Sequence, residues 1–517
     1  MKTIIENKAI IIYLLIYGLF CLFVGFLTNF HVYSNDFWGN LFMAEHLDIS
    51  QPESFYNGFF PLGYAVYLRL FSFGDSIISG YLTNILLGLV MLGSIAYLGS
   101  VTVGPKWALF STIILSILPK IFPYITGPGP DIGTAAFITL GGVLLICSTF
   151  ESDSKRSMKL VVCGGILCGL AAMWRYHGLV LGLSLILSTS IISRRPLYSL
   201  VLGLVGFFII YSIQIFFNVL SGHGSFETST AFNVYKLIYD INWHKVSALK
   251  DVIPTSILDV ILFSTRKFLL NYHSSIQKYL PLFIPSLSGI FLLKERKLIE
   301  ISMVISQVSF LYVIVVVMGD SSRVIIPLLP LIVYQIIVMS KFIYESARDM
   351  LKNSRRLEIV STLTILIIVV GILSSSFLHF DIASIKVRKT RNHVYRAIQE
   401  RLIEDGGGRL TNSRQVFTTD FDLYFPDLKF YRPITNGGWG RYSLFGFNEE
   451  NPELSTRNID EFIKDCYTHN IVYIVLGPNF GFGSDELSKL YYGELKLKQF
   501  EMKSQIGLFK IFKIIYD

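Results

Sequence analysis

Long apolar runs constrain this sequence more than any other feature. About eleven of them occur in the first three quarters of the chain, near residues 8–28, 78–99, 106–123, 131–149, 160–174, 177–192, 199–219, 278–293, 299–318, 323–342 and 357–378. Most approach the roughly 20 residues that an α-helix needs to cross a bilayer. Hydrophobic residues make up 52% of the chain and charged residues only 16%, against about 25% charge in a soluble domain. The pattern predicts a mainly α protein, a polytopic bundle of membrane-spanning helices.

Two of these runs, 160–174 and 177–192, are shorter than a full span and flank the sequence Trp174-Arg175-Tyr176-His177. Irregular backbone is tolerated at membrane depth only where it is buried in protein or lines a cavity. The two runs are therefore interpreted as half-helices that meet inside the membrane.

The basic residues predict the orientation of the bundle. Loops on the side of the N-terminus hold 16 of them, the long loop near 220–277 on the opposite side adds six, and the short segments there hold only Arg69, Lys120, Arg175 and Arg323. Because cytoplasmic loops carry the excess of Lys and Arg, the N-terminus is predicted to be cytoplasmic, with an uncleaved first helix. After an odd number of spans the C-terminus then lies outside. This distribution explains the net charge of +8 by membrane topology, with no nucleic-acid partner.

Two domains are predicted. Residues 1–379 form a transmembrane module with long outer loops near 29–77 and 220–277, and residues 380–517 form a soluble extracytoplasmic domain. Each outer loop contains a stretch suited to a helix that lies in the membrane interface, SNDFWGNLFMAEHL in the first and ILDVILFSTRKFLLNYH in the second. Long structured loops on one face are usually functional.

The last 138 or so residues alternate between helical and strand-like patterns. The helices are predicted at NHVYRAIQERLIED and IDEFIKDCYTHN, and the strands at QVFTT, LKFYR, IVYIVLG and GLFKIFKI. Such alternation is typical of a small α/β domain.

Two acidic residues stand where the chain leaves the hydrocarbon. Asp36 follows the first apolar run, and Asp131 opens the fourth after the sequence Gly-Pro-Gly-Pro. An acid at that depth is costly and invites a functional explanation, although each is also suited to cap the N-terminus of a helix. The predicted topology brings both to one side of the membrane, where paired acids can divide the roles of base and binding group.

Two arginines are expected on that side as well. Arg175 lies between the two short runs, and Arg323 precedes the apolar sequence VIIPLLPLIVY. A guanidinium that faces lipid is expensive, so each is interpreted as facing a cavity or an anion such as phosphate, with snorkelling to the interface as the alternative. His177 is a further candidate for a phosphate contact, and its alternative role is packing.

Other chemistries find little support in the sequence. Glu45 and His46 form one adjacent pair that suits a metal site or the second acid, with no third ligand in view. The motifs GxxxxGK[ST], GxSxG and HExxH are missing. The five cysteines fit neither a zinc motif nor a disulfide framework, so they are interpreted as small core residues.

Taken in order, the motifs resemble those of the GT-C superfamily of membrane glycosyltransferases, which includes protein O-mannosyltransferases and the lipid A aminoarabinose transferase. The resemblance covers nearly the whole chain. It rests on SNDFWGNLFMAEHL with Asp36, FFPLGYAVYL, GPDIGTAAF with Asp131, MWRYHGLVLGLSLIL, and SRVIIPLLPLIVY with Arg323 and Pro327. The sequence departs from the commoner pattern at Asn35-Asp36, where two adjacent acids often stand.

The resemblance implies an inverting glycosyltransferase of the outer membrane face. The donor would be a monosaccharide linked to a polyprenyl phosphate, and the acceptor a hydroxyl of a glycolipid, glycan or protein. Asp36 would act as the base, with a pKa raised by its low-dielectric cavity. Arg175 or Arg323 would stabilise the departing phosphate. The need for a divalent metal stays open. Two other functions also stay open, a transporter or flippase of lipid-linked sugars and an oligosaccharide ligase or polymerase with a diphosphate-linked donor.

Overall fold

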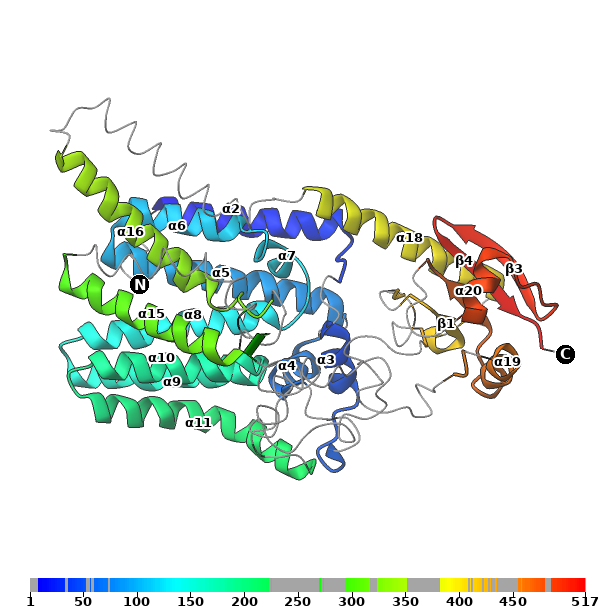
Figure 1. The fold of residues 1–517 in the computed structure, drawn as a ribbon, viewed down its shortest axis with the longest axis horizontal. Coiled ribbons are helices and arrows are strands. Elements are labelled where there is room, and N and C mark those ends of the chain that lie inside the picture. Colours follow the sequence, from blue (N-terminus) through cyan, green and yellow to red (C-terminus); the bar gives the residue numbers. More distant parts are fainter. Residues whose placement is uncertain are drawn as a thin grey trace. The chain divides into compact units, whose positions relative to one another are not determined.

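The protein is described from a computed structural model, which covers residues 8–32, 36–52, 56, 60–72, 75–222, 225, 269–270, 273, 294–316, 323–350, 382–407, 410, 412–420, 423–425, 428, 433–434, 454–456, 458–478 and 485–516. These residues belong to two compact units (Figure 1). The first contains the apolar helices. The second contains Leu27–His31 and the described part of Ile382–Asp517.

Apolar helices make up the first unit. Among the described residues, six are long and apolar enough to cross a membrane, namely α2 (Lys8–Leu27), α5 (Ser76–Thr102), α8 (Asp131–Phe150), α9 (Ser154–Trp174), α11 (Pro196–Leu220) and most of α16 (Leu329–Met350). α6 (Pro105–Ile117) and α10 (His177–Ile192) are shorter, and α15 (Arg296–Val316) packs against α10 and α16. The predicted mainly α bundle is confirmed. Its helix count stays a prediction, because the runs 278–293 and 357–378 lie outside the described residues.

The prediction of two half-helices is wrong for the first of them. α9 has 21 residues and is long enough to cross a bilayer, because the helix begins at Ser154 rather than at the first apolar residue. The Asp153 carboxylate caps it by accepting a hydrogen bond from the Lys155 backbone N–H at 2.9 Å. An N-cap of this kind supplies the partner that the first turn of a helix lacks. α10 has only 16 residues, as its apolar run predicts.

Small residues bring α9 and α11 into close contact. A Cβ added at Gly165 would lie 2.3 Å from the Gly203 carbonyl oxygen, and one at Gly206 would lie 2.4 Å from that of Val162. Gly165 and Gly169 are four residues apart on one face of α9, the spacing that allows two helices to approach closely in a membrane. Close backbone contact replaces the hydrophobic driving force that lipid does not supply.

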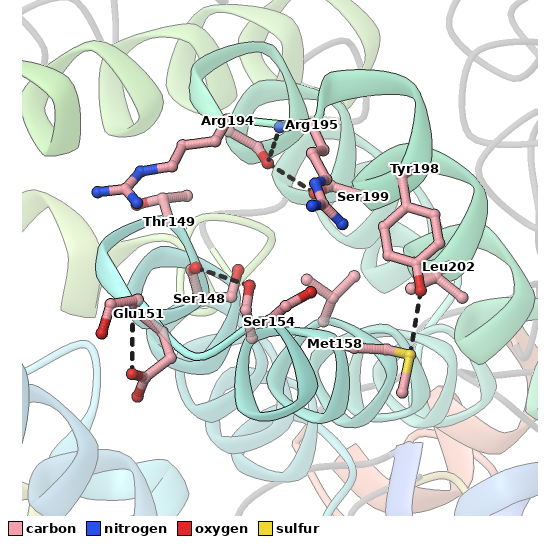
Figure 2. Close-up of a pocket in the computed structure, with 14 residues that line it drawn as sticks. Ser148, Thr149, Glu151, Ser154, Met158, Arg194, Arg195, Tyr198, Ser199 and Leu202 are labelled. Carbon is pink, nitrogen blue, oxygen red and sulfur yellow. Dashed lines mark hydrogen bonds between the residues drawn. The ribbon is translucent and has the colours of Figure 1, made fainter.

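Three short helices lie at one end of the long ones (Figure 1). They are α3 (Asp36–Glu45), α4 (Leu62–Phe71) and α7 (Phe122–Ile125). α3 confirms the helix predicted in the first outer loop. The second predicted interfacial helix, ILDVILFSTRKFLLNYH, falls almost entirely outside the described residues. At the opposite end of α8, the connections from α8 to α9 and from α10 to α11 enclose a polar pocket (Figure 2).

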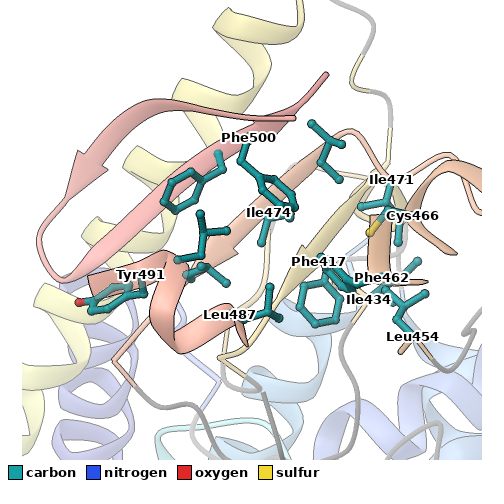
Figure 3. Close-up of a cluster of buried hydrophobic side chains, with 14 residues drawn as sticks. Phe417, Ile434, Leu454, Phe462, Cys466, Ile471, Ile474, Leu487, Tyr491 and Phe500 are labelled. Atoms are coloured by element: carbon teal, nitrogen blue, oxygen red, sulfur yellow. The ribbon is translucent and has the colours of Figure 1, made fainter. Parts of the chain in front are cut away.

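The second unit is built on a four-stranded sheet with the order β1-β2-β4-β3. β1 (Val416–Thr418) and β2 (Tyr473–Leu476) are parallel, whereas β4 (Phe509–Ile514) is antiparallel to both β2 and β3 (Phe500–Ile506). Its helices are α18 (Ile382–Gly406), α19 (Ile459–Thr468) and α20 (Asp485–Tyr492). Phe417, Phe462, Cys466 and other buried apolar side chains fill the space between α19, α20 and the sheet (Figure 3). The small α/β fold predicted for the C-terminal region is confirmed.

Some helices and strands of the second unit match the predictions and others do not. α18, α19, β1, β2 and β4 occupy predicted positions, while α20 and β3 were not predicted. β3 carries exposed and half-buried side chains at most positions, so its sequence FEMKSQI lacks a strong apolar signal. The predicted strand LKFYR lies outside the described residues except for Leu428.

A short segment after α2 belongs to the second unit. The Asn392 side-chain amide of α18 donates to the carbonyl oxygens of Thr28 and Asn29, at 2.9 and 2.8 Å. His31, close by, is buried next to Arg388 and Arg391. Burial and these two cations lower the pKa of His31 to about 3, so its ring is neutral near pH 7.

Candidate active site

Asp36 is the first residue of α3, and its side chain is almost fully buried. Its carboxylate does not cap the helix. The Oδ2 atom accepts a hydrogen bond from Arg323 Nη1 at 3.1 Å and a second from Arg175 Nη2. Asn40, one turn later, donates to the Asp36 backbone carbonyl at 2.8 Å and fixes the start of the helix. Asp36 thus presents its carboxylate to two guanidinium groups from distant parts of the chain.

Asp131 opens α8 and is equally buried. The residue at the N-cap is Pro130, which supplies no side-chain cap, and the Asp131 carboxylate accepts from Arg175 Nη2 at 2.9 and 3.1 Å. An acid in the first turn also benefits from the helix dipole. The carboxylates of Asp36 and Asp131 therefore bind arginine side chains and do not cap their helices.

An asparagine inside α5 forms hydrogen bonds to the turn that precedes Asp131. The Asn84 side-chain amide donates to the carbonyl oxygens of Tyr124, Gly127 and Gly129, at 3.1, 2.6 and 3.0 Å. The two amide hydrogens of one buried side chain are thus shared among three carbonyl groups of an irregular loop that has no ladder partner. The position of Asp131 depends on this contact.

Arg175 lies at the corner between α9 and α10. The corner is tight, since a Cβ at Gly178 would lie 2.4 Å from the Ala171 carbonyl oxygen. The neighbouring Trp174 indole packs onto α8 at Gly133, where a Cβ would lie 2.2 Å from Trp174 Nε1. These two glycines let α8, α9 and α10 meet closely enough for Arg175 to reach both acids.

Arg323 stands in a turn that precedes α16. Its side chain is 27% exposed and that of Arg175 is 15% exposed. Both guanidinium groups donate hydrogen bonds to buried carboxylates. The structure brings together four of the predicted site residues, Asp36, Asp131, Arg175 and Arg323.

The electrostatics of Asp36 contradict the raised pKa that its cavity predicts. Burial raises the pKa of this carboxyl group, but Arg323 and Arg175 together outweigh burial and hold the pKa below its usual value. Asp36 is therefore ionised near pH 7, with its charge compensated by two cations. A sequence alone does not reveal such compensation, because the partners lie 139 and 287 residues away.

Three side-chain nitrogens at this corner have no hydrogen-bond partner within the described part of the chain. They are Trp174 Nε1, Arg175 Nε and His177 Nε2, and all three atoms are buried. Nearly all buried polar groups in proteins are paired with protein or water. A set of unpaired nitrogens beside a cationic cluster is suited to receive a polar ligand, and the phosphate contact of His177 stays a prediction.

A buried polar network that the sequence interpretation missed supports the same corner. The Tyr56 hydroxyl lies 2.8 Å from that of Tyr176 and donates to Asn218 Oδ1 at 2.5 Å. Gln214 Nε2 donates to Tyr56 at 2.6 Å, and Gln214 Oε1 accepts from the Leu62 backbone N–H at 2.9 Å. The sequence does contain a signal for this network. Gln214 and Asn218 lie four residues apart in the apolar helix α11, and polar side chains inside spanning helices are rare.

Glu45 and His46 lie away from the cluster. Glu45 ends α3, nine residues after Asp36, which corresponds to roughly 13 Å along the helix axis. The His46 ring stacks on Phe42, and its Nδ1 lies 2.9 Å from the Phe42 carbonyl oxygen. Among the described residues, no three of the types His, Cys, Asp and Glu come together as metal ligands. The metal site proposed for Glu45 and His46 stays an untested prediction, and Asn35 lies outside the described residues.

The bundle and the short helices at its end define an integral, multi-pass membrane protein with the GT-C fold. No known family profile matches the sequence, and no curated protein matches it either. The structure is similar to that of ArnT from Cupriavidus metallidurans in the apo state, with a TM-score of 0.55 and 12% identity over 98% of both chains.

Two further solved structures extend this comparison. ArnT bound to undecaprenyl phosphate gives a TM-score of 0.53 at 12% identity, over 97% of this chain and 98% of that one. The archaeal oligosaccharyltransferase AglB from Archaeoglobus fulgidus, in complex with an inhibitory peptide and a dolichol-phosphate, gives 0.50 at 11% identity, over 94% of this chain and 71% of that one. At such identities the likeness establishes the fold, which is the GT-C fold that the motifs predicted.

Proposed function

We propose that this protein is an inverting glycosyltransferase that moves a monosaccharide from a polyprenyl phosphate to a hydroxyl acceptor at the outer face of the membrane. The observation that carries the proposal is the shared hydrogen bonding of Asp36 to Arg175 and Arg323, beside Asp131. A buried base between two phosphate-binding groups is what this reaction requires. The fold supports it, because ArnT with the same fold binds undecaprenyl phosphate.

The reaction forms one bond and breaks one. The acceptor oxygen attacks the anomeric carbon from the side opposite the phosphate, while Asp36 takes the hydroxyl proton. The bond between the anomeric carbon and the phosphate oxygen breaks, and its electron pair goes to that oxygen. Arg175 and Arg323 stabilise the charge that develops there. A single displacement inverts the configuration of the sugar.

The donor phosphate takes over part of the hydrogen bonding that Asp36 has in the free protein. Each guanidinium group carries five N–H donors, which suit phosphate as well as carboxylate. Once these donors turn to phosphate, less positive charge compensates Asp36, and its pKa rises toward that of a useful base. Arg175 Nε and His177 Nε2, both buried and without a partner among the described residues, supply further contacts for the phosphate.

Asp131 keeps Arg175 in position by hydrogen bonds of 2.9 and 3.1 Å. In the proposed mechanism it remains ionised and orients the guanidinium group toward the phosphate. The acceptor class, whether glycolipid, glycan or protein, is set by the outer loops and by residues 380–517, which we propose form an extracytoplasmic domain.

The orientation in the membrane is part of the proposal. The site lies at the N-terminal end of α8, and the basic residues around Lys155 and Arg194 lie at the other end, about 30 Å away along a helix of 20 residues. Since the basic side is cytoplasmic by the positive-inside rule, the site opens to the outside.

An Asp36→Asn variant tests the base. The transfer of sugar from a polyprenyl phosphate sugar, measured in membranes that contain the full chain, is expected to fall roughly 10²- to 10⁴-fold. Asp48→Asn is the matched control, because Asp48 is exposed in the same loop region and its carboxylate hydrogen-bonds only to Ser50 among the described residues. Undiminished transfer by Asp36→Asn would remove Asp36 from the role of base. A wild-type protein that moves the donor across vesicles without forming a glycosidic bond would be a transporter instead.

The likeness to AglB favours a second candidate, an oligosaccharyltransferase. Two guanidinium groups also suit the larger charge of a diphosphate-linked donor. Supplying the purified protein with monophosphate-linked and diphosphate-linked sugars in turn discriminates between them, and we expect turnover with the monophosphate.

A further inference from the structure

The polar pocket at the opposite end of α8 has a composition unlike that of the surrounding surface. It has a volume of about 140 Å³ and lies between the α8–α9 connection, the α10–α11 connection and the first turns of α9 and α11. Serine hydroxyls and two arginines contribute much of its lining. Figure 2 shows Tyr198, Ser199 and Leu202 of α11 facing Ser154 and Met158 of α9, with Arg194 and Arg195 above.

The charges around the pocket are unequal and only partly paired. Residues 148–159 and 193–199 contain five basic and two acidic residues. One acid, Glu151, is already engaged by Arg156 at 3.1 Å and by two backbone N–H groups. Arg194 and Arg195 have no acidic partner within the described residues, although both line the pocket. Guanidinium groups without an acidic partner, carried by two neighbouring residues, are suited to bind a phosphate group.

Backbone donors add to this preference for an anion. α11 begins at Pro196, and the residue at its N-cap, Arg195, provides no side-chain cap. The N–H groups of the first turn therefore lack partners within the helix. They point toward the end of α11 that borders the pocket, where the helix dipole favours negative charge.

The surface next to the pocket is apolar and faces outward. Leu197 is 74% exposed and Ile191 57%, while Tyr198 and Val201 are about half exposed. In a chain that spans a membrane, such side chains of α10 and α11 contact lipid tails. A ligand in the pocket therefore meets water and arginines on one side and the hydrocarbon of the bilayer on the other. Free phosphate uses only the first of these, whereas a phospholipid uses both.

We propose that this pocket binds the phosphate-bearing headgroup of an anionic phospholipid, with Arg194 and Arg195 on the phosphate and the acyl chains along α11. This lipid site is separate from the proposed reaction centre, since the two lie at opposite ends of α8. Basic pockets between membrane helices are known to recognise anionic lipids in this way. The proposal does not depend on the enzymatic activity of the protein.

Native mass spectrometry of the full chain, purified in detergent and mixed with phosphatidylglycerol or phosphatidylcholine, tests it. The wild type is expected to retain phosphatidylglycerol in preference. The double variant Arg194→Gln/Arg195→Gln is expected to lose that preference by about tenfold or more, since each basic residue near an anionic lipid contributes roughly fivefold. The charge-preserving variant Arg194→Lys/Arg195→Lys is expected to retain most of it.

The control removes two charges from the same end of the bundle. Lys294 and Arg296 are exposed at the start of α15, where Arg296 pairs with Glu300, and Lys297 beside them lies 4.7 Å from the Phe150 ring of α8. Lys294→Gln/Arg296→Gln is expected to bind phosphatidylglycerol like the wild type. Equal losses in the two glutamine variants would mean that the lipid responds to overall charge, which overturns the proposal.

A second measurement needs no variant. A photoactivatable phosphatidylglycerol, cross-linked to the wild type and mapped by peptide analysis, is expected to label the segments 148–161 and 193–202. Labelling spread over all the connections at that end, or displacement of the lipid by an equal concentration of inorganic phosphate, would contradict a phospholipid site.

Discussion

The two ends of the helices in the first unit use the same kinds of charged residue to different effect. At the end that contains Asp36, two buried acids share Arg175, whose side chain is 15% exposed. At the other end, the pair Arg156–Glu151 has exposed fractions of 71% and 20%, and Arg194 and Arg195 are exposed. The separation between charges is similar at both ends, at 2.9 Å for Arg175–Asp131 and 3.1 Å for Arg156–Glu151.

Burial accounts for the difference. A buried ion pair has lost its hydration, so removing one partner leaves a charge with no compensation. An exposed pair exchanges its partner for water at little cost. The buried end is therefore a place where a ligand that competes for a guanidinium group changes the properties of a carboxylate. The exposed end offers positive charge to the phospholipid that we propose, and it supports the proposed orientation of the chain.

The largest contrast is expected between Arg175→Met and Arg156→Met. Arg175→Met leaves Asp131 without its guanidinium partner and Asp36 with one cation fewer, and is expected to lower the free energy of unfolding by about 3–5 kcal/mol. Arg156→Met is expected to lower it by less than about 1 kcal/mol. Denaturant unfolding of the purified chain in detergent measures both values. Similar losses in the two variants would mean that burial does not separate the two ends.

A smaller effect is expected from Gly133→Ala. Its Cβ would lie 2.2 Å from Trp174 Nε1, so the indole and the adjacent Arg175 must shift. A displacement of about 1 Å in a catalytic site costs on the order of 100-fold in rate, which a sugar-transfer assay measures. The control is Gly142→Ala on the same helix, where the Cβ would contact only the Leu185 side chain at 3.3 Å or more. Equal rates in the two variants would show that Trp174 does not position Arg175.

Asn84→Leu is expected to lower both the stability and the activity of the protein. It removes three hydrogen bonds to the loop before Asp131, and leaving buried carbonyl groups without partners costs about 1–3 kcal/mol. Ser94→Ala in the same helix loses one bond to the Val90 carbonyl, whose helical partner remains. We expect thermal stability and transfer to fall in Asn84→Leu and to stay near wild type in Ser94→Ala. A loss of stability with unchanged transfer would mean that Asn84 does not position Asp131 for the reaction.

The smallest effect is expected from mild acid. The pKa of Asp36 in the folded protein lies below its ordinary value, about 3.9. A lowered pKa means that the ionised Asp36 contributes its full stability above about pH 4 and loses it as the pH falls through the folded value. The difference in unfolding free energy between wild type and Asp36→Asn should therefore stay constant from pH 8 to 5. A wild-type unfolding free energy that rises relative to Asp36→Asn as the pH falls from 7 to 5 would mean that burial dominates and the pKa is raised.

Much of the fold was predictable because the membrane imposes it. Lipid offers no hydrogen bonds to the backbone, so long apolar runs become helices, and α5, α8 and α11 follow their runs closely. The start of α9 was not predictable from hydropathy, since all residues from Ser154 to Lys159 except Met158 are polar and join the helix through the cap at Asp153. β3 was missed because its exposed side chains leave no alternating apolar pattern.

The site residues were predictable in identity but not in their contacts. Asp36, Asp131, Arg175 and Arg323 were recognisable because ionisable groups near the bilayer are rare. That Arg175 bridges both acids, and that Arg323 joins Asp36, depends on tertiary packing at Gly133 and Gly178. The lowered pKa of Asp36 follows from those contacts and was therefore predicted with the wrong sign.

The claim that phosphate and Asp36 share the same arginines is tested most directly by an affinity measurement. The affinity for undecaprenyl phosphate is compared between the purified full-length wild type, Asp36→Asn and Arg323→Gln. If phosphate competes with Asp36 for the guanidinium groups, Asp36→Asn binds the lipid phosphate at least as tightly as the wild type while its sugar transfer is strongly reduced, and Arg323→Gln binds it more weakly. If Asp36→Asn loses affinity to the same extent as Arg323→Gln, the carboxylate and the phosphate do not share these arginines, and the proposed reaction centre is wrong.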